Sequence, residues 1–332
     1  MNEKRNTCNF APMKKFLLIV WLGLSQESCA QPSYYSSQEA ELAITGGTLK
    51  GTLFTPNNVN RPAVVLIIAG SGPTDRDGNS PLLAGKNNSL LQLADSLAAR
   101  GIASLRYDKR GVAKSQIKEF KEEQMLFTDG VSDAQGWVQW LREKGFRKIY
   151  IAGHSEGSLV GLIAAQSEKI KGFISIAGVG RPIDLVLREQ LAAGAGPDSL
   201  KLLANRYLDT LMSGQRIAKP NPLLFSLFRP SVQPYMISWL RYDPQQLIRS
   251  LALPVLIMQG TNDMQVKETD AELLARAKPD AKLVIIENMN HVLKEVKSSA
   301  RAYNMASYSN PGLPVMPQLV NAIDQFVKGK LN

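Results

Sequence analysis

Short apolar runs alternate with amphipathic segments along most of this chain. The runs have the length and composition of strands that are buried on both faces: PAVVLIIAG (62–70), IASLRYD (102–108), KIYIAG (148–153), GFISIAG (172–178), PVLIMQG (254–260) and KLVIIE (282–287). Between them lie segments with apolar residues at helical spacing: SLLQLADSLAAR (89–100), SDAQGWVQWLREKG (132–145), GSLVGLIAAQSE (157–168) and TDAELLARAK (269–278). Strands that alternate with helices predict an α/β fold with a mostly parallel sheet covered by helices.

Two intervals depart from this alternation. Residues 41–56, ELAITGGTLKGTLFTP, are typical of a β-hairpin that turns at Gly46-Gly47 and adds an antiparallel edge. Residues 179–245 contain helical pieces and a proline-rich stretch but no strand. A connection of this length within one domain is usually a lid or an inserted subdomain, and its content of leucine, phenylalanine and tyrosine argues against a disordered loop.

The amino terminus has the features of an export signal. Two lysines precede the apolar stretch FLLIVWLGL (16–24), which is too short to span a bilayer. Cleavage after Ala30 would leave Gln31 as the first residue. The stretch also resembles a bacterial lipoprotein signal, in which Cys29 would become the lipidated first residue. Both interpretations predict a periplasmic, envelope-anchored or secreted protein, and the alternative is a cytoplasmic protein with an apolar amino-terminal helix.

The charge is positive but spread along the chain. The formal net charge is +10, without a block of like charges or a basic run interleaved with aromatic residues, so nucleic acid is not a predicted partner. The cysteines, Cys8 and Cys29, both lie in the signal segment, and the mature chain is therefore expected to hold no disulfide and no cysteine-based metal site. Whether translation starts at Met1 or at Met13 stays open, and the oligomeric state is not predicted.

Ser155 lies in the motif Gly-His-Ser-Glu-Gly between a predicted strand and a predicted helix. A nucleophile on such a tight turn strains the backbone, and side chains at positions 153 and 157 would clash, which explains the two glycines. The turn also directs the amino end of the helix toward the reacting atom, where it favours negative charge. Ser155 is therefore the candidate nucleophile.

A serine hydroxyl needs a base to take its proton, and the chain has 2 histidines. His154 is adjacent to Ser155, and successive side chains of a strand point to opposite faces, so its ring is not expected to reach the hydroxyl. His291 follows the last predicted strand, at the carboxyl edge of the sheet where Ser155 also lies. His291 is the candidate base.

The base needs a carboxylate that orients it. Asp263 follows the strand at 254–260 on the same edge, although a simple turn residue is the alternative interpretation. Asp270 is a weaker candidate because it falls inside the next predicted helix. The order serine, aspartate, histidine along the chain is typical of the α/β-hydrolases and favours Asp263.

These motifs lie at the positions along the chain where α/β-hydrolases carry their functional motifs. From about residue 40 to residue 330 the sequence resembles an α/β-hydrolase, on the stretches IIAGSGPTDRDG, LRYDKRGVAKS, GHSEGS, LIMQGTNDMQV and ENMNHV. Within the superfamily it is similar to bacterial esterases and serine-aminopeptidase-like hydrolases with an inserted cap. The resemblance implies an α/β-hydrolase core at 31–178 and 246–332, interrupted by the cap at 179–245 and preceded by the signal at 1–30. It also implies Ser155 as nucleophile, His291 as base and acid, and Asp263 as its orienting partner.

The resemblance implies an oxyanion hole made of two backbone N–H groups. One belongs to Glu156, and the other comes from the loop after the first parallel strand, where many relatives carry His-Gly and this chain has Ala-Gly-Ser-Gly at 69–72. The second donor is assigned to Ser71, with Gly72 as the second choice. The side chain of Glu156 is favourable at a helix amino terminus, and the sharper alternative is that it attracts a cationic group of a substrate.

The loop that follows these glycines invites other interpretations. It lacks the third glycine of a dinucleotide fingerprint and the Gly-Lys-Ser/Thr ending of a P-loop. Asp75, Asp77 and Asn79 resemble the start of a calcium loop, but glycine stands at the fourth place and Lys86 where a glutamate belongs. No metal and no cofactor are predicted. Asp108, after the next strand, is interpreted as a structural acceptor.

The predicted function is hydrolysis of carboxylic esters through an acyl-enzyme intermediate, with a small-molecule ester or a short peptide as substrate. A serine peptidase of aminopeptidase type is the alternative, followed by a non-catalytic binding protein on a hydrolase scaffold. Apolar residues of the cap are candidate substrate contacts, although packing of a small lid explains them equally well: Phe225, Phe228 and Trp239.

Overall fold

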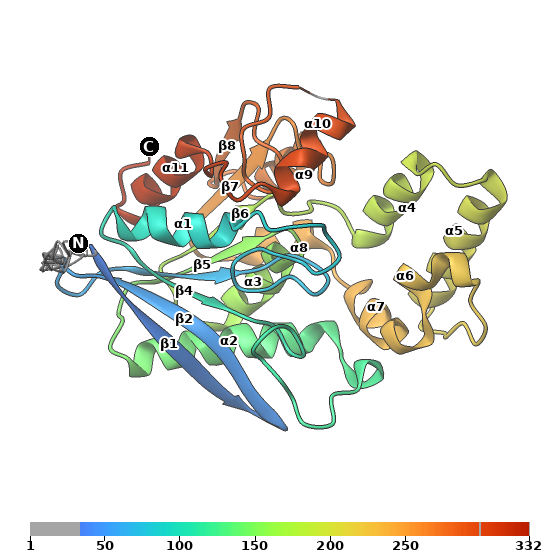
Figure 1. Cartoon of the computed structure of the whole chain (residues 1–332), viewed down its shortest axis with the longest axis horizontal. Coiled ribbons are helices and arrows are strands. Elements are labelled where there is room, and N and C mark those ends of the chain that lie inside the picture. The colour runs from blue at the N-terminus through green and yellow to red at the C-terminus, as the bar shows by residue number, and fades with distance from the viewer. Residues whose placement is uncertain (1–33, 299, 332) are drawn as a thin grey trace, which may run out of the picture. The chain divides into compact units, whose positions relative to one another are not determined.

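One mixed sheet organises the chain. The computed structural model describes residues 34–298 and 300–331, and its strands in this part are β1 (Tyr35–Ile44), β2 (Gly47–Pro56), β3 (Val64–Ile68), β4 (Ala103–Tyr107), β5 (Ile149–His154), β6 (Gly172–Ile176), β7 (Val255–Gly260) and β8 (Lys282–Ile286). They lie in the order β1-β2-β4-β3-β5-β6-β7-β8 (Figure 1). Every pair from β4 to β8 in this order is parallel. The predicted α/β fold with a mostly parallel sheet is confirmed.

The hairpin β1–β2 forms the antiparallel edge that the sequence predicts. Its turn places Ile44 opposite Gly47, and Gly46 has a φ of +83° that favours glycine. Strand β1 begins at Tyr35, before the predicted start of the hairpin at residue 41. The added residues Ser36 to Glu39 are polar and exposed, and they therefore lack the alternation from which a strand is predicted.

The helices of the described residues fall into a core set and a cap set. The core set comprises α1 (Ser89–Ala98), α2 (Phe127–Glu143), α3 (Glu156–Ser167), α8 (Pro244–Ser250), α9 (Glu268–Ala277), α10 (Arg301–Ala306) and α11 (Pro317–Val327). Helix α2 begins before the predicted residue 132, because the side chain of Asp129 accepts the backbone N–H of Leu126 and caps the first turn. Helices α10 and α11 were not predicted from the sequence.

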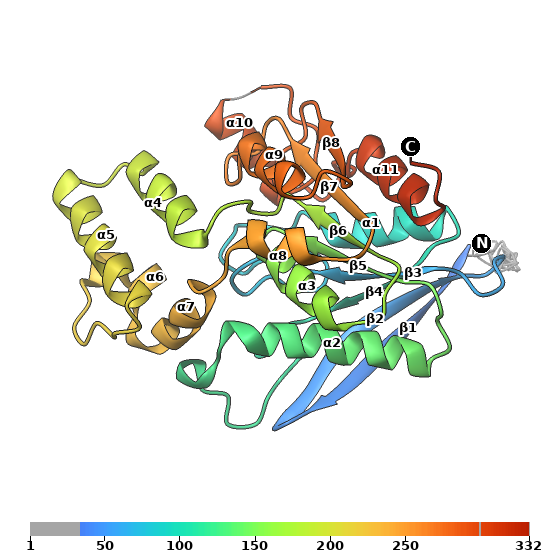
Figure 2. The same ribbon diagram turned by 180° about the vertical axis from the view of Figure 1, so that it is seen from behind.

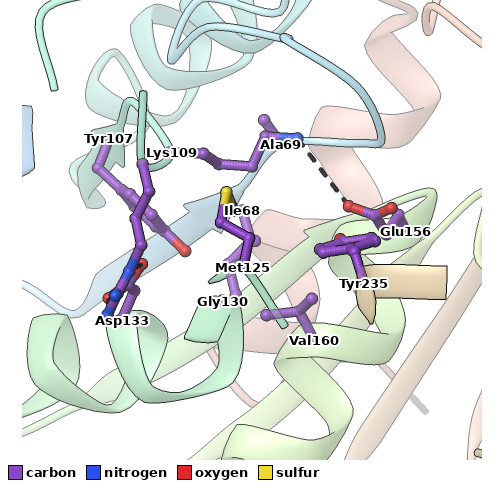
Figure 3. A pocket seen from close by; sticks show the side chains of 11 residues that line it. Ile68, Ala69, Tyr107, Lys109, Met125, Gly130, Asp133, Glu156, Val160 and Tyr235 are labelled. Carbon is purple, nitrogen blue, oxygen red and sulfur yellow. Dashed lines mark hydrogen bonds and ion pairs between the residues drawn. The ribbon is translucent and has the colours of Figure 1, made fainter. Parts of the chain in front are cut away.

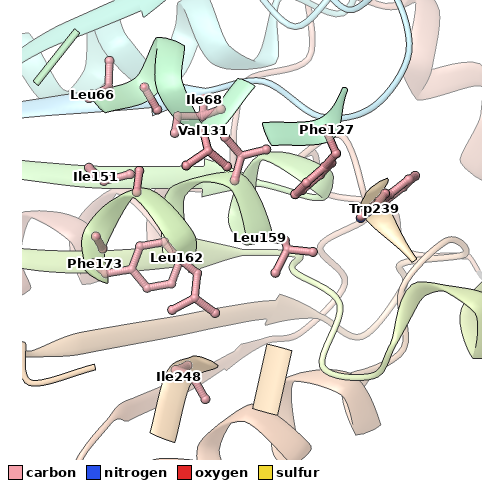
Figure 4. Packing of buried hydrophobic residues seen from close by; sticks show 14 of the residues in the cluster. Leu66, Ile68, Phe127, Val131, Ile151, Leu159, Leu162, Phe173, Trp239 and Ile248 are labelled. Carbon is pink, nitrogen blue, oxygen red and sulfur yellow. The ribbon is translucent and has the colours of Figure 1, made fainter. Parts of the chain in front are cut away.

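Each face of the sheet carries its own apolar core. Helices α2, α3, α8 and α9 pack on one face with Leu66 and Ile68 of β3, whereas α1 and α11 pack on the other with Val65 and Ile67 (Figure 2). Strand β3 is buried on both faces, which explains its uninterrupted apolar run. Figure 4 shows the first core continuing from Phe173 past Leu159 to the cap residue Trp239.

The interval 179–245 contains no strand and folds mainly into α4 (Ile183–Ala193), α5 (Asp198–Met212), α6 (Phe225–Phe228) and α7 (Gln233–Trp239). Helix α7 joins these cap helices to the core. The ring of Trp239 stacks on Phe127 of α2 at 5.7 Å, and the N–H of Phe127 donates to Ser238 Oγ over 2.7 Å. Arg229 adds an ion pair with Glu122 of the core. The cap is therefore anchored through α7 and the residues just before it, and α4 adds an ion pair of Glu189 with Lys267 and a hydrogen bond of Gln190 to the Gln265 carbonyl.

The predicted export signal at 1–30, including Cys29 and the proposed cleavage site, lies outside the described residues. Within the residues that are described, no helix combines the length and the apolar character needed to cross a membrane.

Candidate active site

Ser155 is the single residue between β5 and α3, and it forms a strained turn there. Its φ of 55° and ψ of −122° place a non-glycine residue in a region that side chains disfavour. A Cβ at Gly153 would lie 2.0 Å from the carbonyl oxygen of Gly157, and a Cβ at Gly157 would lie 2.5 Å from that of Ile68. Both glycines of the motif are thus required by close backbone packing, as the sequence predicts.

His291 and Asp263 meet at the carboxyl edge of the sheet. Nδ1 of His291 lies 2.8 Å from Oδ2 of Asp263, and both side chains are almost completely buried. The other carboxylate oxygen of Asp263 accepts the N–H groups of Gln265 at 2.7 Å and Val266 at 3.0 Å. Burial disfavours the charged form, but His291 and these N–H groups outweigh it and hold the pKa of Asp263 below its ordinary value. The carboxylate is therefore fixed and charged.

His154 links this pair to the turn. Its Nε2 lies 2.8 Å from the carbonyl oxygen of His291, and the two imidazole rings are 4.8 Å apart between centroids. Because His154 directly precedes Ser155, the contact brings His291 to the serine turn. Within residues 34–298 and 300–331, no hydrogen bond joins the Ser155 hydroxyl to the His291 ring.

His154 is held as a neutral ring. Burial, reinforced by the neighbouring His291, lowers the pKa of His154 to about 3. Its Nε2 is directed at the His291 carbonyl, in keeping with the expectation that it does not serve the Ser155 hydroxyl. His154 is therefore a structural partner of the site.

The loop after β3 passes directly over the serine turn. A Cβ at Gly70 would lie 3.2 Å from the Cβ of Ser155. The backbone N–H groups of Ser71, Gly72 and Glu156 donate to no acceptor among the described residues. Glu156 directly follows Ser155 and Ser71 directly follows Gly70, so these candidate oxyanion donors belong to the two segments that meet at the turn.

An ion pair fixes the rest of this loop. The N–H of Arg76 donates to Asp108 Oδ1 and its Nη2 to Asp108 Oδ2, each over 2.8 Å, and Nη1 donates to Thr52 Oγ1 over 2.7 Å. The Asp75 carboxylate accepts the backbone N–H groups of Asp77 and Asn79. Asp108 is therefore a structural acceptor. In the described part of the chain, no group of His, Cys, Asp or Glu side chains forms a potential metal site.

The weaker candidate acid, Asp270, belongs to a different interaction. Its buried carboxylate accepts the backbone N–H of Gly180 at 3.0 Å. It also accepts two hydrogen bonds from the Arg181 guanidinium, from Nε at 3.0 Å and from Nη2 at 2.7 Å. These contacts join α9 to the loop after β6. The structure therefore pairs His291 with Asp263 and not with Asp270.

The side chain of Glu156 is buried next to the turn, where it lies beside the ammonium group of Lys109. Lys109 Nζ lies 4.0 Å from Glu156 Oε1, and the ion pair borders a cavity of about 30 Å³ behind the loop (Figure 3). Burial raises the pKa of Glu156, while Lys109 and a hydrogen bond from Tyr235 of the cap oppose the rise. The carboxylate is therefore not a free site for a cationic substrate group. Sequence reasoning missed Lys109, and its signal was a charged residue two positions after a buried strand.

The three candidate substrate contacts of the cap differ in exposure. Phe228 is completely buried against Tyr207, Trp239 at the end of α7 is 9% exposed, and Phe225 is 43% exposed. Phe228 and Trp239 thus have packing roles, and a substrate role for any of the three stays a prediction.

Comparison with known proteins agrees with this architecture. A model of the alpha/beta hydrolase family matches residues 65–293. Esterase EstD of Thermotoga maritima is 26% identical over 273 residues, which cover 78% of this chain and 60% of the relative. Est1E of Butyrivibrio proteoclasticus, solved with ferulic acid, aligns with a TM-score of 0.58 and 19% identity over 88% of this chain and 99% of its own. The alpha/beta hydrolase GrgF of Penicillium sp. sh18 aligns with a TM-score of 0.58 and 18% identity over 89% and 99%.

Proposed function

Because the chain belongs to the alpha/beta hydrolase family, we propose that it is a serine hydrolase that cleaves carboxylic esters through an acyl-enzyme intermediate. The observation that carries the proposal is the 2.8 Å hydrogen bond between His291 and Asp263 beside the strained Ser155 turn. The relative EstD, named an esterase, supports the choice of an ester as substrate, although the chain spans only 60% of its length.

In the proposed mechanism, Asp263 accepts the Nδ1 proton of His291 and leaves Nε2 as the base. His291 takes the proton of the Ser155 hydroxyl while the serine oxygen attacks the ester carbonyl. The backbone N–H groups of Glu156 and Ser71, with Gly72 as the second choice, bind the oxyanion. His291 then protonates the leaving alcohol, and a water molecule repeats the sequence to release the acid.

The positive φ of Ser155 assists this chemistry, since it lifts the hydroxyl out of the sheet at the amino end of α3. The helix dipole favours the negative charge that develops there. The N–H groups of Ser71, Gly72 and Glu156 donate to no acceptor among the described residues, which supports their proposed role as oxyanion donors.

Turnover of a series of p-nitrophenyl acyl esters of increasing length, measured beside aminoacyl p-nitroanilides, tests the proposal. We expect ester cleavage, and a loss on the order of 10⁴-fold or more in kcat for Ser155→Ala. Ser132→Ala, an exposed serine on α2, is the matched control and should retain full turnover. Anilide turnover that exceeds ester turnover would instead identify a peptidase, and unchanged rates in Ser155→Ala would refute the mechanism.

We also propose that the protein is exported. Support comes from the lysines and the apolar stretch at 16–24, followed by Cys29 and Ala30. Mass spectrometry of the mature amino terminus separates an acylated Cys29 from a free Gln31. An intact terminus at Met1 or Met13 in the native host would contradict export through a cleaved signal.

A further inference from the structure

Lys109 contacts one residue on each of the two segments that carry the proposed oxyanion donors: the backbone of Gly70 and the side chain of Glu156. It follows β4, and its Nζ donates a hydrogen bond to the carbonyl oxygen of Gly70. The same Nζ lies 4.0 Å from the carboxylate of Glu156 (Figure 3). The Lys109 side chain is 21% exposed, so this ammonium is largely shielded from water. One cation therefore connects the loop after β3 with the first residue of α3.

The contact with Gly70 acts on the N–H group of the next residue. The Gly70 carbonyl and the Ser71 N–H belong to one planar peptide unit, and no peptide bond in the described part of the chain is cis. In a trans peptide the C=O and N–H bonds point in opposite directions. A cation bound to the carbonyl therefore fixes the direction of the N–H, and it also polarises the peptide so that the N–H becomes a stronger donor.

The contact with Glu156 has a separate electrostatic effect. The oxyanion of the proposed mechanism would form beside the backbone of Glu156, whose own carboxylate is almost fully buried. A buried negative charge so close to a developing negative charge raises the energy of the transition state. Lys109 compensates that charge, and Tyr235 from the cap lines the same cavity as the carboxylate.

We infer that Lys109 is a positioning residue of the oxyanion hole: it orients the Gly70–Ser71 peptide and neutralises Glu156, so that two N–H groups face the transition state in a region without excess negative charge. The inference rests on the proposed function. Because both effects act on the oxyanion, loss of Lys109 slows the chemical step more than it weakens substrate binding.

Kinetics of Lys109→Met with a p-nitrophenyl ester, together with inhibition by phenylboronic acid, test the inference. Phenylboronic acid forms a tetrahedral adduct with an active serine and so reports on the hole directly. Loss of one direct oxyanion donor costs about 10² to 10³ in kcat, and loss of a residue that orients a donor should cost about 10- to 100-fold. We expect kcat to fall and the inhibition constant to rise by the same factor, while KM changes less than about threefold.

Three further variants separate positioning from a merely structural role. Lys109→Arg keeps the charge and should recover part of kcat. Lys109→Met combined with Glu156→Gln removes the uncompensated carboxylate and should be faster than Lys109→Met alone, which loss of packing would not produce. Lys114→Met, whose side chain is 70% exposed, is the matched control and should behave as the wild type.

The outcomes are distinguishable from those of the proposed function. A wild-type protein without Ser155-dependent ester turnover would refute the proposed function. Wild-type turnover that depends on Ser155, with Lys109→Met unchanged or altered only in KM, would overturn the inference alone. The same holds if the double variant is no faster than Lys109→Met. If Lys109→Met does not fold, Lys109→Gln takes its place in the same measurements.

Discussion

Mild acid should destabilise this protein through His154, and the size of the effect follows from its burial. The folded state holds the ring neutral because burial and the neighbouring His291 lower the pKa of His154 from 6.5 to about 3. In the unfolded chain the ring takes up a proton below pH 6.5. The unfolded state therefore binds more protons in this window, so the stability that the neutral ring provides is complete above pH 6.5 and is lost as the pH falls toward 3.

The magnitude is set by the distance between the working pH and the unfolded pKa. Each pH unit below that value costs about 1.4 kcal/mol, so a change from about pH 7.5 to about pH 5 removes about 2 kcal/mol of unfolding free energy. His154→Gln keeps a side-chain N–H that can donate to the His291 carbonyl but does not titrate. Its stability should therefore lack this component of the pH dependence.

The assay is urea unfolding of the wild type and of His154→Gln at both pH values, followed by circular dichroism. All other titratable groups are common to the two proteins, so their contributions cancel in the difference. The wild type should lose about 2 kcal/mol more than the variant between the two conditions. Equal losses in the two proteins would show that His154 is not held neutral, and the reasoning about its burial would be wrong.

Four further changes probe the turn, the carboxylates and the cap. Gly153→Ala forces a Cβ to within 2.0 Å of the Gly157 carbonyl oxygen and should abolish the native thermal transition. The control Gly196→Ala, whose Cβ would lie 3.7 Å from its nearest neighbour, should unfold at the wild-type temperature. A native thermal transition in Gly153→Ala would contradict the turn geometry. Asp263→Asn should lower kcat on the order of 10³-fold or more, because the amide cannot hold the His291 tautomer. Asp270→Asn should instead cost about 2 kcal/mol of stability in denaturant unfolding with kcat within about threefold, and the reverse pattern would reassign the acid. Arg229→Ala removes the ion pair with Glu122 and should accelerate chymotrypsin cleavage within the cap. Arg216→Ala, at an exposed arginine of the cap, is the control and should not. Equal cleavage rates in the two variants would show that the ion pair does not hold the cap.

The fold could be predicted because most of its strands are buried on both faces. Strands β3 and β5 to β7 carry continuous apolar runs, and each lies close to its predicted range. Strand β8 has the same apolar composition but forms the edge of the sheet, so Leu283 and Ile285 are 37% and 38% exposed. Apolar composition alone does not distinguish an edge strand from a central one, because the position in the sheet depends on the pairing of distant segments.

The candidate site was partly predictable for a related reason. Ser155, Asp263 and His291 each follow a strand, and parallel strands bring their carboxyl ends to one edge. The contact between His291 and Asp263 follows from that rule, and the catalytic roles of the three residues stay a prediction. The grouping of Lys109, Glu156 and Tyr235 could not be predicted, since it joins a loop, a helix start and a cap helix across space.

The most direct test of the account is covalent labelling by a fluorophosphonate probe with mass spectrometry of the adduct. We expect one adduct on Ser155 in the wild type, none in Ser155→Ala, and labelling of His291→Ala that is slower on the order of 10³-fold or more. Labelling of another residue, or equal labelling rates in the wild type and His291→Ala, would contradict the claim that hydroxyl, imidazole and carboxylate act as one unit.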